Sequence, residues 1–186
     1  LVSEGIDGLV LPLGRRISLG RRGTTFVRDV PGPAGSNEVP VVLLHGWFAS
    51  GGLNWFRCFD PLSETRRVIA PDLRGHGRGI DTLRRFRLAD CADDVVMTLD
   101  ELGIEKAIFV GYSMGGPVAQ LIWQRAPERV AGLVFVATSS SFVPVLHQRM
   151  AVTAAMAAIA GTTRVGQVIS RIPRPLRPDL PDELVE

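Results

Sequence analysis

Apolar residues follow two spacings along this chain, and these predict strands and helices in turn. Short apolar runs predict strands over residues 17–19, 24–30, 39–44, 67–70, 107–110 and 130–137. Helical spacing predicts helices over 88–102 and 117–125, and Asn54 is predicted to cap a helix that includes Trp55, Phe56 and Phe59. Because strands and helices alternate from residue 39 to 137, we expect a mostly parallel, doubly wound α/β sheet with flanking helices.

The predicted helix over 88–102 separates apolar from acidic positions. Its apolar face holds Leu88, Cys91, Ala92, Val95, Val96, Leu99 and Leu102. The opposite face holds most of the acidic residues, which are Asp90, Asp93, Asp94, Asp100 and Glu101. We interpret these acids as a solvated surface rather than a metal site.

Changes in composition divide the chain into three parts. Residues 1–38 hold a predicted hairpin around residues 20–23 and a Pro/Gly-rich loop. Residues 39–141 form the predicted α/β core. Residues 142–186 begin with an alanine-rich helical pattern and continue as a proline-rich segment, which we interpret as the start of a lid.

Composition narrows the classes of function. With 186 residues, 46% apolar and 22% charged, the chain is typical of a globular domain, and a net charge of +2 argues against nucleic-acid binding. Cys58 and Cys91 lack metal-ligand spacing, so we expect no metal and a reducing cytoplasm. The longest apolar run, residues 151–160, is too short to span a membrane, and no signal peptide is recognised at the start.

A Gly-x-Ser-x-Gly pattern lies between the predicted strand 107–110 and the next helix. It centres on Ser113, with Gly111 and Gly115 on either side. This pattern in a strand–turn–helix context is typical of a nucleophile elbow, which lifts a serine hydroxyl above the sheet. The glycines are expected because side chains there would collide with neighbouring backbone in so tight a turn.

Two further motifs precede the elbow. Leu-Leu-His-Gly-Trp occupies residues 43–47 at the end of a buried strand, and Pro-Asp-Leu-Arg-Gly-His-Gly occupies residues 71–77. With these three motifs in this order, over about residues 39–141, the chain resembles the α/β-hydrolase superfamily, in its esterase and lipase-like branch.

This resemblance implies a serine hydrolase that forms an acyl-enzyme on Ser113 and needs no cofactor. The backbone N–H groups of Trp47 and Met114 would bind the oxyanion, and His45 and Gly46 would support that loop. A serine at this position argues against the dehalogenase and epoxide-hydrolase branches, which use aspartate. The expected partner is a small-molecule acyl substrate, and the oligomeric state is left open.

The rest of a catalytic triad does not follow from this chain. In the fold the order is serine, acid, histidine. Only His147 follows Ser113 as a histidine, and only Glu128 lies between them as an acid, at the far end of the elbow helix. We interpret His147 as a lid residue and His76 as part of a structural loop in which Arg74 and Arg78 oppose protonation. Asp179, Asp182 and Glu183 have no histidine after them.

We therefore expect the acid and the histidine to lie beyond residue 186, the final strands to be missing, and the chain as given to be inactive. Two alternatives stay open. One is a non-catalytic protein that binds a small ligand on a hydrolase scaffold. The other is a related enzyme, such as a thioesterase, haloperoxidase, carbon–carbon hydrolase or acyltransferase, because fold and elbow do not separate these activities.

Overall fold

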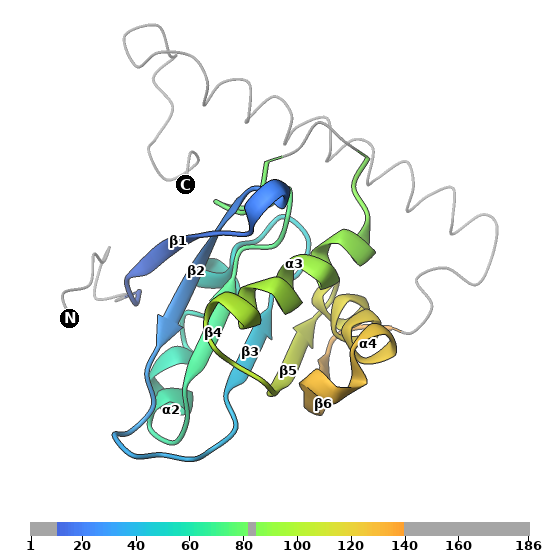
Figure 1. Cartoon of the computed structure of the whole chain (residues 1–186). Helices are drawn as coiled ribbons and strands as arrows, with labels where there is room; N and C mark the ends of the chain where they lie inside the picture. The colour runs from blue at the N-terminus through green and yellow to red at the C-terminus, as the bar shows by residue number, and fades with distance from the viewer. Residues whose placement is uncertain (1–10, 82–84, 140–186) are drawn as a thin grey trace, which may run out of the picture. The chain divides into compact units, whose positions relative to one another are not determined.

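A computed structural model describes residues 11–81 and 85–139. Within these residues six strands form one sheet in the order β1-β2-β4-β3-β5-β6 (Figure 1). The strands are β1 (Gly14–Ser18), β2 (Thr24–Val30), β3 (Val41–Leu44), β4 (Val68–Pro71), β5 (Ala107–Tyr112) and β6 (Val130–Val136). The β1–β2 and β2–β4 pairs are antiparallel, and the other three pairs are parallel. The predicted α/β class and mostly parallel sheet are confirmed.

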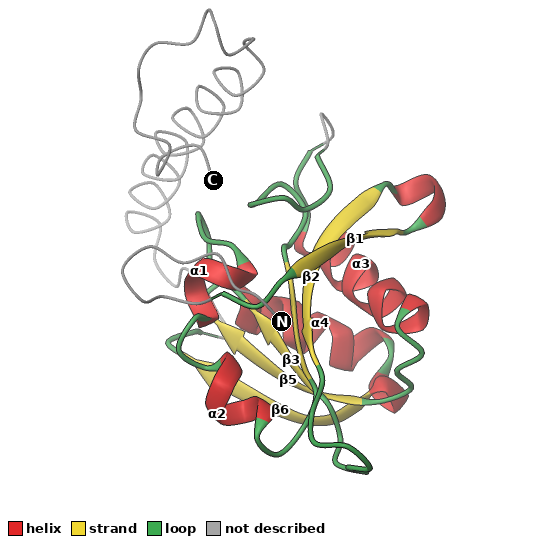
Figure 2. Ribbon diagram, turned by 90° about the vertical axis from the view of Figure 1, so that its left-hand side faces the viewer, coloured by secondary structure: helices red, strands yellow, loops and turns green. Residues whose placement is uncertain are grey.

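Helices cover both faces of the sheet (Figure 2). The helices α3 (Leu88–Glu101) and α4 (Gly115–Arg125) pack on one face, and the short helices α1 (Gly51–Trp55) and α2 (Phe59–Ser63) pack on the other. Two 3-10 helices, η1 (Gly20–Arg22) and η2 (Pro127–Arg129), complete the elements of the described residues. None of the helices in the described part of the chain is long and apolar enough to cross a membrane.

The strand side chains explain this two-sided covering. In β3 the side chains of Val42 and Leu44 enter the core under α3 and α4, whereas those of Val41 and Leu43 enter the core under α1 and α2. All four residues are buried, as expected for a strand inside a parallel sheet. The predicted hairpin is present, and β2 joins the same sheet by pairing with β4.

The predicted cap at Asn54 is wrong. Ser50 caps α1, because its extended backbone allows its Oγ to accept a hydrogen bond from the Leu53 N–H at 3.1 Å. The helix ends at Trp55, and Phe59 begins α2 instead of continuing α1. The true start was missed because it consists of two glycines, Gly51 and Gly52, which disfavour helix formation.

One acid of α3 is not solvated as predicted. Asp94 is only 5% exposed, and its carboxylate accepts hydrogen bonds from two arginines, Arg22 in η1 and Arg74 in the loop after β4. Nitrogen–oxygen distances of 2.6 and 2.7 Å join Asp94 to these side chains. Helical periodicity could not reveal this pairing, because both arginines come from other elements. Their charges make burial of the carboxylate tolerable.

The proposed boundary at residue 142 and the helical pattern after it lie outside the described residues, so this part of the domain division stays a prediction.

Candidate active site

Ser113 occupies the turn between β5 and α4. Its φ is +48°, a conformation that side chains rarely adopt. The Ser113 N–H donates to the Val136 carbonyl at 3.0 Å. The Ser113 carbonyl accepts from the Gly116 N–H at 3.1 Å and from Thr138 Oγ1 at 2.7 Å. The strained turn is therefore held by hydrogen bonds to the end of β6 and to the residues after it.

The two glycines that flank Ser113 allow the turn to pack closely. A Cβ at Gly111 would collide with the backbone of Gly115 and Gly116, and a Cβ at Gly115 would collide with the carbonyl of Leu44. Glycine is needed at both positions because backbone atoms occupy the space that a side chain would fill, as predicted from the sequence.

The loop after β3 lies beside this turn. Parallel pairing sets Leu44 opposite Gly111, so the residues that follow each strand meet at one edge of the sheet. A Cβ at Gly46 would come within 3.2 Å of Ser113 Cβ. Within residues 11–81 and 85–139, no hydrogen-bond acceptor is found for the backbone N–H of Trp47 or of Met114. Two donors thus remain available next to the serine.

His45 is a buried structural element of this loop. Its Nε2 accepts from the Leu73 N–H at 2.9 Å, so the proton must be on Nδ1, which donates to the Gly46 carbonyl at 2.7 Å. Burial lowers the pKa of His45 to about 4. A neutral ring with both nitrogens engaged cannot take a proton from Ser113.

His76 belongs to the loop after β4, as predicted, but the reason given for its neutrality is wrong. Arg74 points to Asp94, and the Arg78 guanidinium lies 3.7 Å from the centre of the Phe26 ring. Burial is what lowers the pKa of His76, against its hydrogen bond to the Arg74 carbonyl. The ring packs edge-on against Trp47, with 5.1 Å between ring centres.

Asp72, in the same loop, connects it to α1. One carboxylate oxygen accepts from the Gly51 N–H and the other from the Arg78 N–H, each at 2.8 Å. Burial raises the pKa of Asp72, and the two N–H donors oppose this rise. The loop after β4 is therefore bound both to His45, through the Leu73 N–H, and to α1, through Asp72.

The structure does not bring an acid and a base to the serine. No hydrogen bond joins His45 or His76 to Ser113 among the described residues. Glu128 lies in η2, just before β6, where Val130 pairs with Ala107 at the start of β5. That edge of the sheet is opposite the serine, as predicted. His147, Asp179, Asp182 and Glu183 lie outside the described residues.

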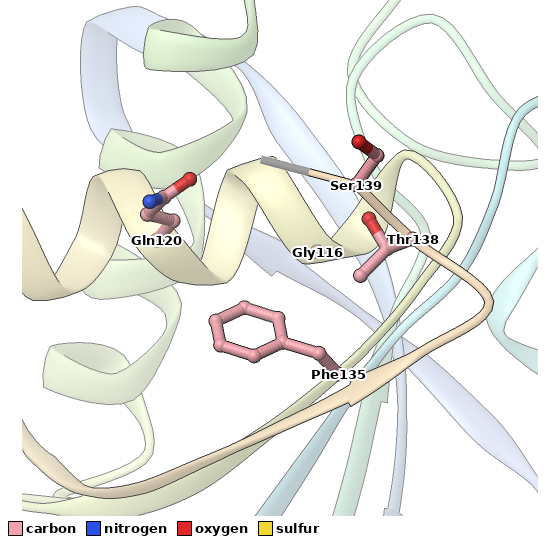
Figure 3. A pocket seen from close by; sticks show the side chains of 5 residues that line it. All are labelled: Gly116, Gln120, Phe135, Thr138 and Ser139. Atoms are coloured by element: carbon pink, nitrogen blue, oxygen red, sulfur yellow. The ribbon is translucent and has the colours of Figure 1, made fainter. Parts of the chain in front are cut away.

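A cavity of about 220 Å³ lies beside the elbow helix (Figure 3). The residues that line it are Gly116, Gln120, Phe135, Thr138 and Ser139. Two of these residues, Gly116 and Thr138, hydrogen-bond the Ser113 carbonyl, and Ser113 itself is not among the lining residues. In the described part of the chain, no three His, Cys, Asp or Glu side chains gather to hold a metal ion.

Comparison with known sequences agrees with this geometry. The α/β hydrolase fold family matches residues 39–163, more than half of the chain. The chain belongs to that family. This member of the α/β hydrolase fold family is 41% identical over 105 residues to a "Dihydrolipoyllysine-residue acetyltransferase component of acetoin cleaving system" from Pseudomonas putida. That match covers 56% of this chain and 28% of the relative.

Two further relatives extend the comparison. The chain is 36% identical over 108 residues to a pimeloyl-[acyl-carrier protein] methyl ester esterase from Yersinia enterocolitica, a match covering 58% of this chain and 40% of the relative. A solved hydrolase from Pseudomonas aeruginosa PA01 superposes with a TM-score of 0.64 at 28% identity, over 70% of this chain and 48% of that one. The chain therefore spans less than half of these relatives.

Proposed function

We propose that Ser113 is the nucleophile of a serine hydrolase that acts on carboxylic esters or related acyl compounds. The observation that carries this proposal is the serine at φ +48° between β5 and α4, beside two backbone N–H groups that have no acceptor in the described residues. A serine on a strained strand-to-helix turn next to unused N–H donors is characteristic of acyl-transfer sites.

The reaction would proceed in two halves. Ser113 Oγ attacks the acyl carbonyl and gives its proton to a histidine base, while the N–H groups of Trp47 and Met114 bind the oxyanion. The base then protonates the departing alcohol, which leaves an acyl-enzyme. Water attacks the acyl group with the same base, and the acid product leaves as Ser113 regains its proton. Each oxyanion donor is typically worth about 3 kcal/mol in the transition state.

The base and its orienting acid are proposed to come from outside the described residues, in the usual order of serine, acid and histidine. Support comes from the described histidines, since His45 has both ring nitrogens engaged and neither His45 nor His76 bonds to Ser113. His45, Gly46, Gly111 and Gly115 would act by fixing the loop and the elbow. We also keep residues 39–141 as the proposed hydrolase core and 142–186 as the start of a lid.

The esterase from Yersinia enterocolitica supports a carboxylic ester as the substrate. The acetyltransferase component from Pseudomonas putida favours a second candidate, in which the acyl group passes to an acceptor other than water. We place the protein in a reducing cytoplasm, which agrees with the free thiols of Cys58 and Cys91.

Labelling of the full-length protein by a fluorophosphonate probe tests the nucleophile. We expect labelling of the unmodified protein and none of Ser113→Ala. Ser63→Ala is the matched control, because its hydroxyl bonds within α2 and should leave labelling unchanged. Labelling that survives Ser113→Ala would remove Ser113 from the mechanism. Absence of both labelling and p-nitrophenyl ester turnover in the unmodified protein would favour a ligand-binding role.

A further inference from the structure

Asn54 joins α1 to the loop after β3. It is half-buried in the last turn of the helix, and its Oδ1 accepts from the Gly46 N–H at 2.9 Å. Its own backbone N–H donates to the Ser50 carbonyl at 3.0 Å, which holds the Asn54 main chain in the helix. A helix residue thus reaches the peptide group that comes just before the proposed oxyanion donor.

Two side chains hold the two consecutive peptide groups of this loop. The peptide between Gly46 and Trp47 is held at its carbonyl by His45 Nδ1. Because a peptide group is planar, that bond also fixes the direction of the Trp47 N–H. The peptide between His45 and Gly46 is held at its N–H by Asn54, so both sides of the Gly46 Cα are fixed.

Gly46 needs such anchoring because of its surroundings. It has no Cβ, and one there would come within 2.9 Å of the Tyr112 ring and 3.2 Å of Ser113 Cβ. Glycine is the residue with the most backbone freedom, so packing alone restrains this turn weakly. Two residues after Gly46, the backbone passes through a strained conformation at Phe48, whose φ is +60°. Without Asn54, the buried Gly46 N–H would be unpaired, and rotation would offer it other acceptors.

We propose that Asn54 is a positioning residue that orients the Trp47 N–H toward the oxyanion by holding the Gly46 N–H; this rests on the function proposed for Ser113. A purely structural role in α1 is a weaker account. The cap of that helix is supplied by Ser50, and the Asn54 side chain bonds outside the helix.

The test uses the full-length protein and three variants. Asn54→Leu keeps the branched shape of the side chain but has no acceptor, and Asn54→Asp keeps an acceptor oxygen. Ser50→Ala removes the cap of α1 while leaving the bond to Gly46 intact. For each variant, kcat and KM are measured with a p-nitrophenyl ester, inhibition with a phenylboronic acid that mimics the tetrahedral state, and Gly46 amide exchange by NMR.

We expect Asn54→Leu to lower kcat about tenfold or more with KM nearly unchanged, since the loss falls on the transition state. Boronate affinity should fall in parallel, and the Gly46 amide should exchange faster. Asn54→Asp should recover kcat relative to Asn54→Leu, because it keeps an acceptor for the Gly46 N–H. The recovery should be only partial, because the added negative charge of the aspartate opposes the oxyanion. Ser50→Ala should keep kcat and the slow exchange.

An unchanged kcat in Asn54→Leu would overturn the proposal, as would an equal loss in Ser50→Ala. If the unmodified protein has no turnover, the proposed hydrolase function is refuted, but the contact between Asn54 and Gly46 can still be tested by the rate of Gly46 amide exchange alone. Faster exchange in Asn54→Leu but not in Ser50→Ala would still assign the positioning contact, and equal exchange in all variants would refute it.

Discussion

Lowering the pH should destabilise the protein through His45. The pKa of this buried imidazole is about 4 in the folded protein, against an ordinary value of 6.5. Between these values the unfolded chain binds a proton that the folded protein does not, so stability falls as the pH falls from 6.5 toward 4. At 1.36 kcal/mol per pKa unit, the whole window corresponds to about 3 kcal/mol, of which about 1.4 kcal/mol is lost by pH 5.5.

Tryptophan fluorescence would follow urea unfolding of the full-length protein and measure this loss of stability. Measurements at about pH 7.5, 6.5, 5.5 and 4.5 cover the range between the two pKa values. His45→Gln keeps a donor and an acceptor but cannot titrate, so its free energy of unfolding should fall less steeply with pH. Slopes are compared, because the substitution also lowers stability at every pH.

The control for this experiment is His76→Gln. Burial lowers the pKa of His76 in the same direction, but the ring is less buried, so its removal should flatten the slope less. If His45→Gln retained the full slope of the unmodified protein below pH 6.5, the assignment of His45 as a buried neutral imidazole would be refuted.

Two further predictions concern stability and association. Asp94→Ala should lower the free energy of unfolding by about 3 kcal/mol, because it leaves the nearly buried Arg74 unpaired. Asp93→Ala should cost no more than about 1 kcal/mol, because its nearer partner Arg125 is half-exposed and its contact with Arg22 is long, at 3.9 Å. Equal urea midpoints for the two variants would contradict this. The 186-residue chain expressed alone should form oligomers through β6, where Val134, Phe135 and Val136 are 45%, 51% and 37% exposed at the sheet edge, and Phe135→Lys should reduce them in light-scattering chromatography. A monomeric unmodified chain would refute that prediction.

Much of the fold was predictable because its strands are short apolar runs separated by turn residues. The run ending at Val110 and the motif around Ser113 together predict a strand, a sharp turn and a helix, which are local features. The same local reading failed at Asn54, where a polar residue before aromatic ones resembled a cap. It failed again at Asp94, whose arginine partners come from two other elements.

The supporting residues of the candidate site were missed for the same reason. Thr138 bonds the Ser113 carbonyl, and Asp72 bonds the Gly51 N–H, across distances in sequence that no periodicity reports. Some signal was present. Asp72 follows a strand directly, and polar residues at the ends of parallel strands meet at one edge of the sheet. Which of them pair, and through which atoms, depends on strand order, which spacing does not encode.

The central place of β3 in the sheet has a consequence for folding. Its neighbours are β4 and β5, so Val41 must pair with Ile108 across the intervening α1, α2, β4 and α3. Such non-local parallel pairing is slow, because loop-closure entropy is lost before the contacts form. The nearness of Gly46 to Ser113 depends on this pairing. Fluorophosphonate reactivity should therefore return late in refolding, after helical circular dichroism has recovered, and would serve as a kinetic reporter of the completed sheet.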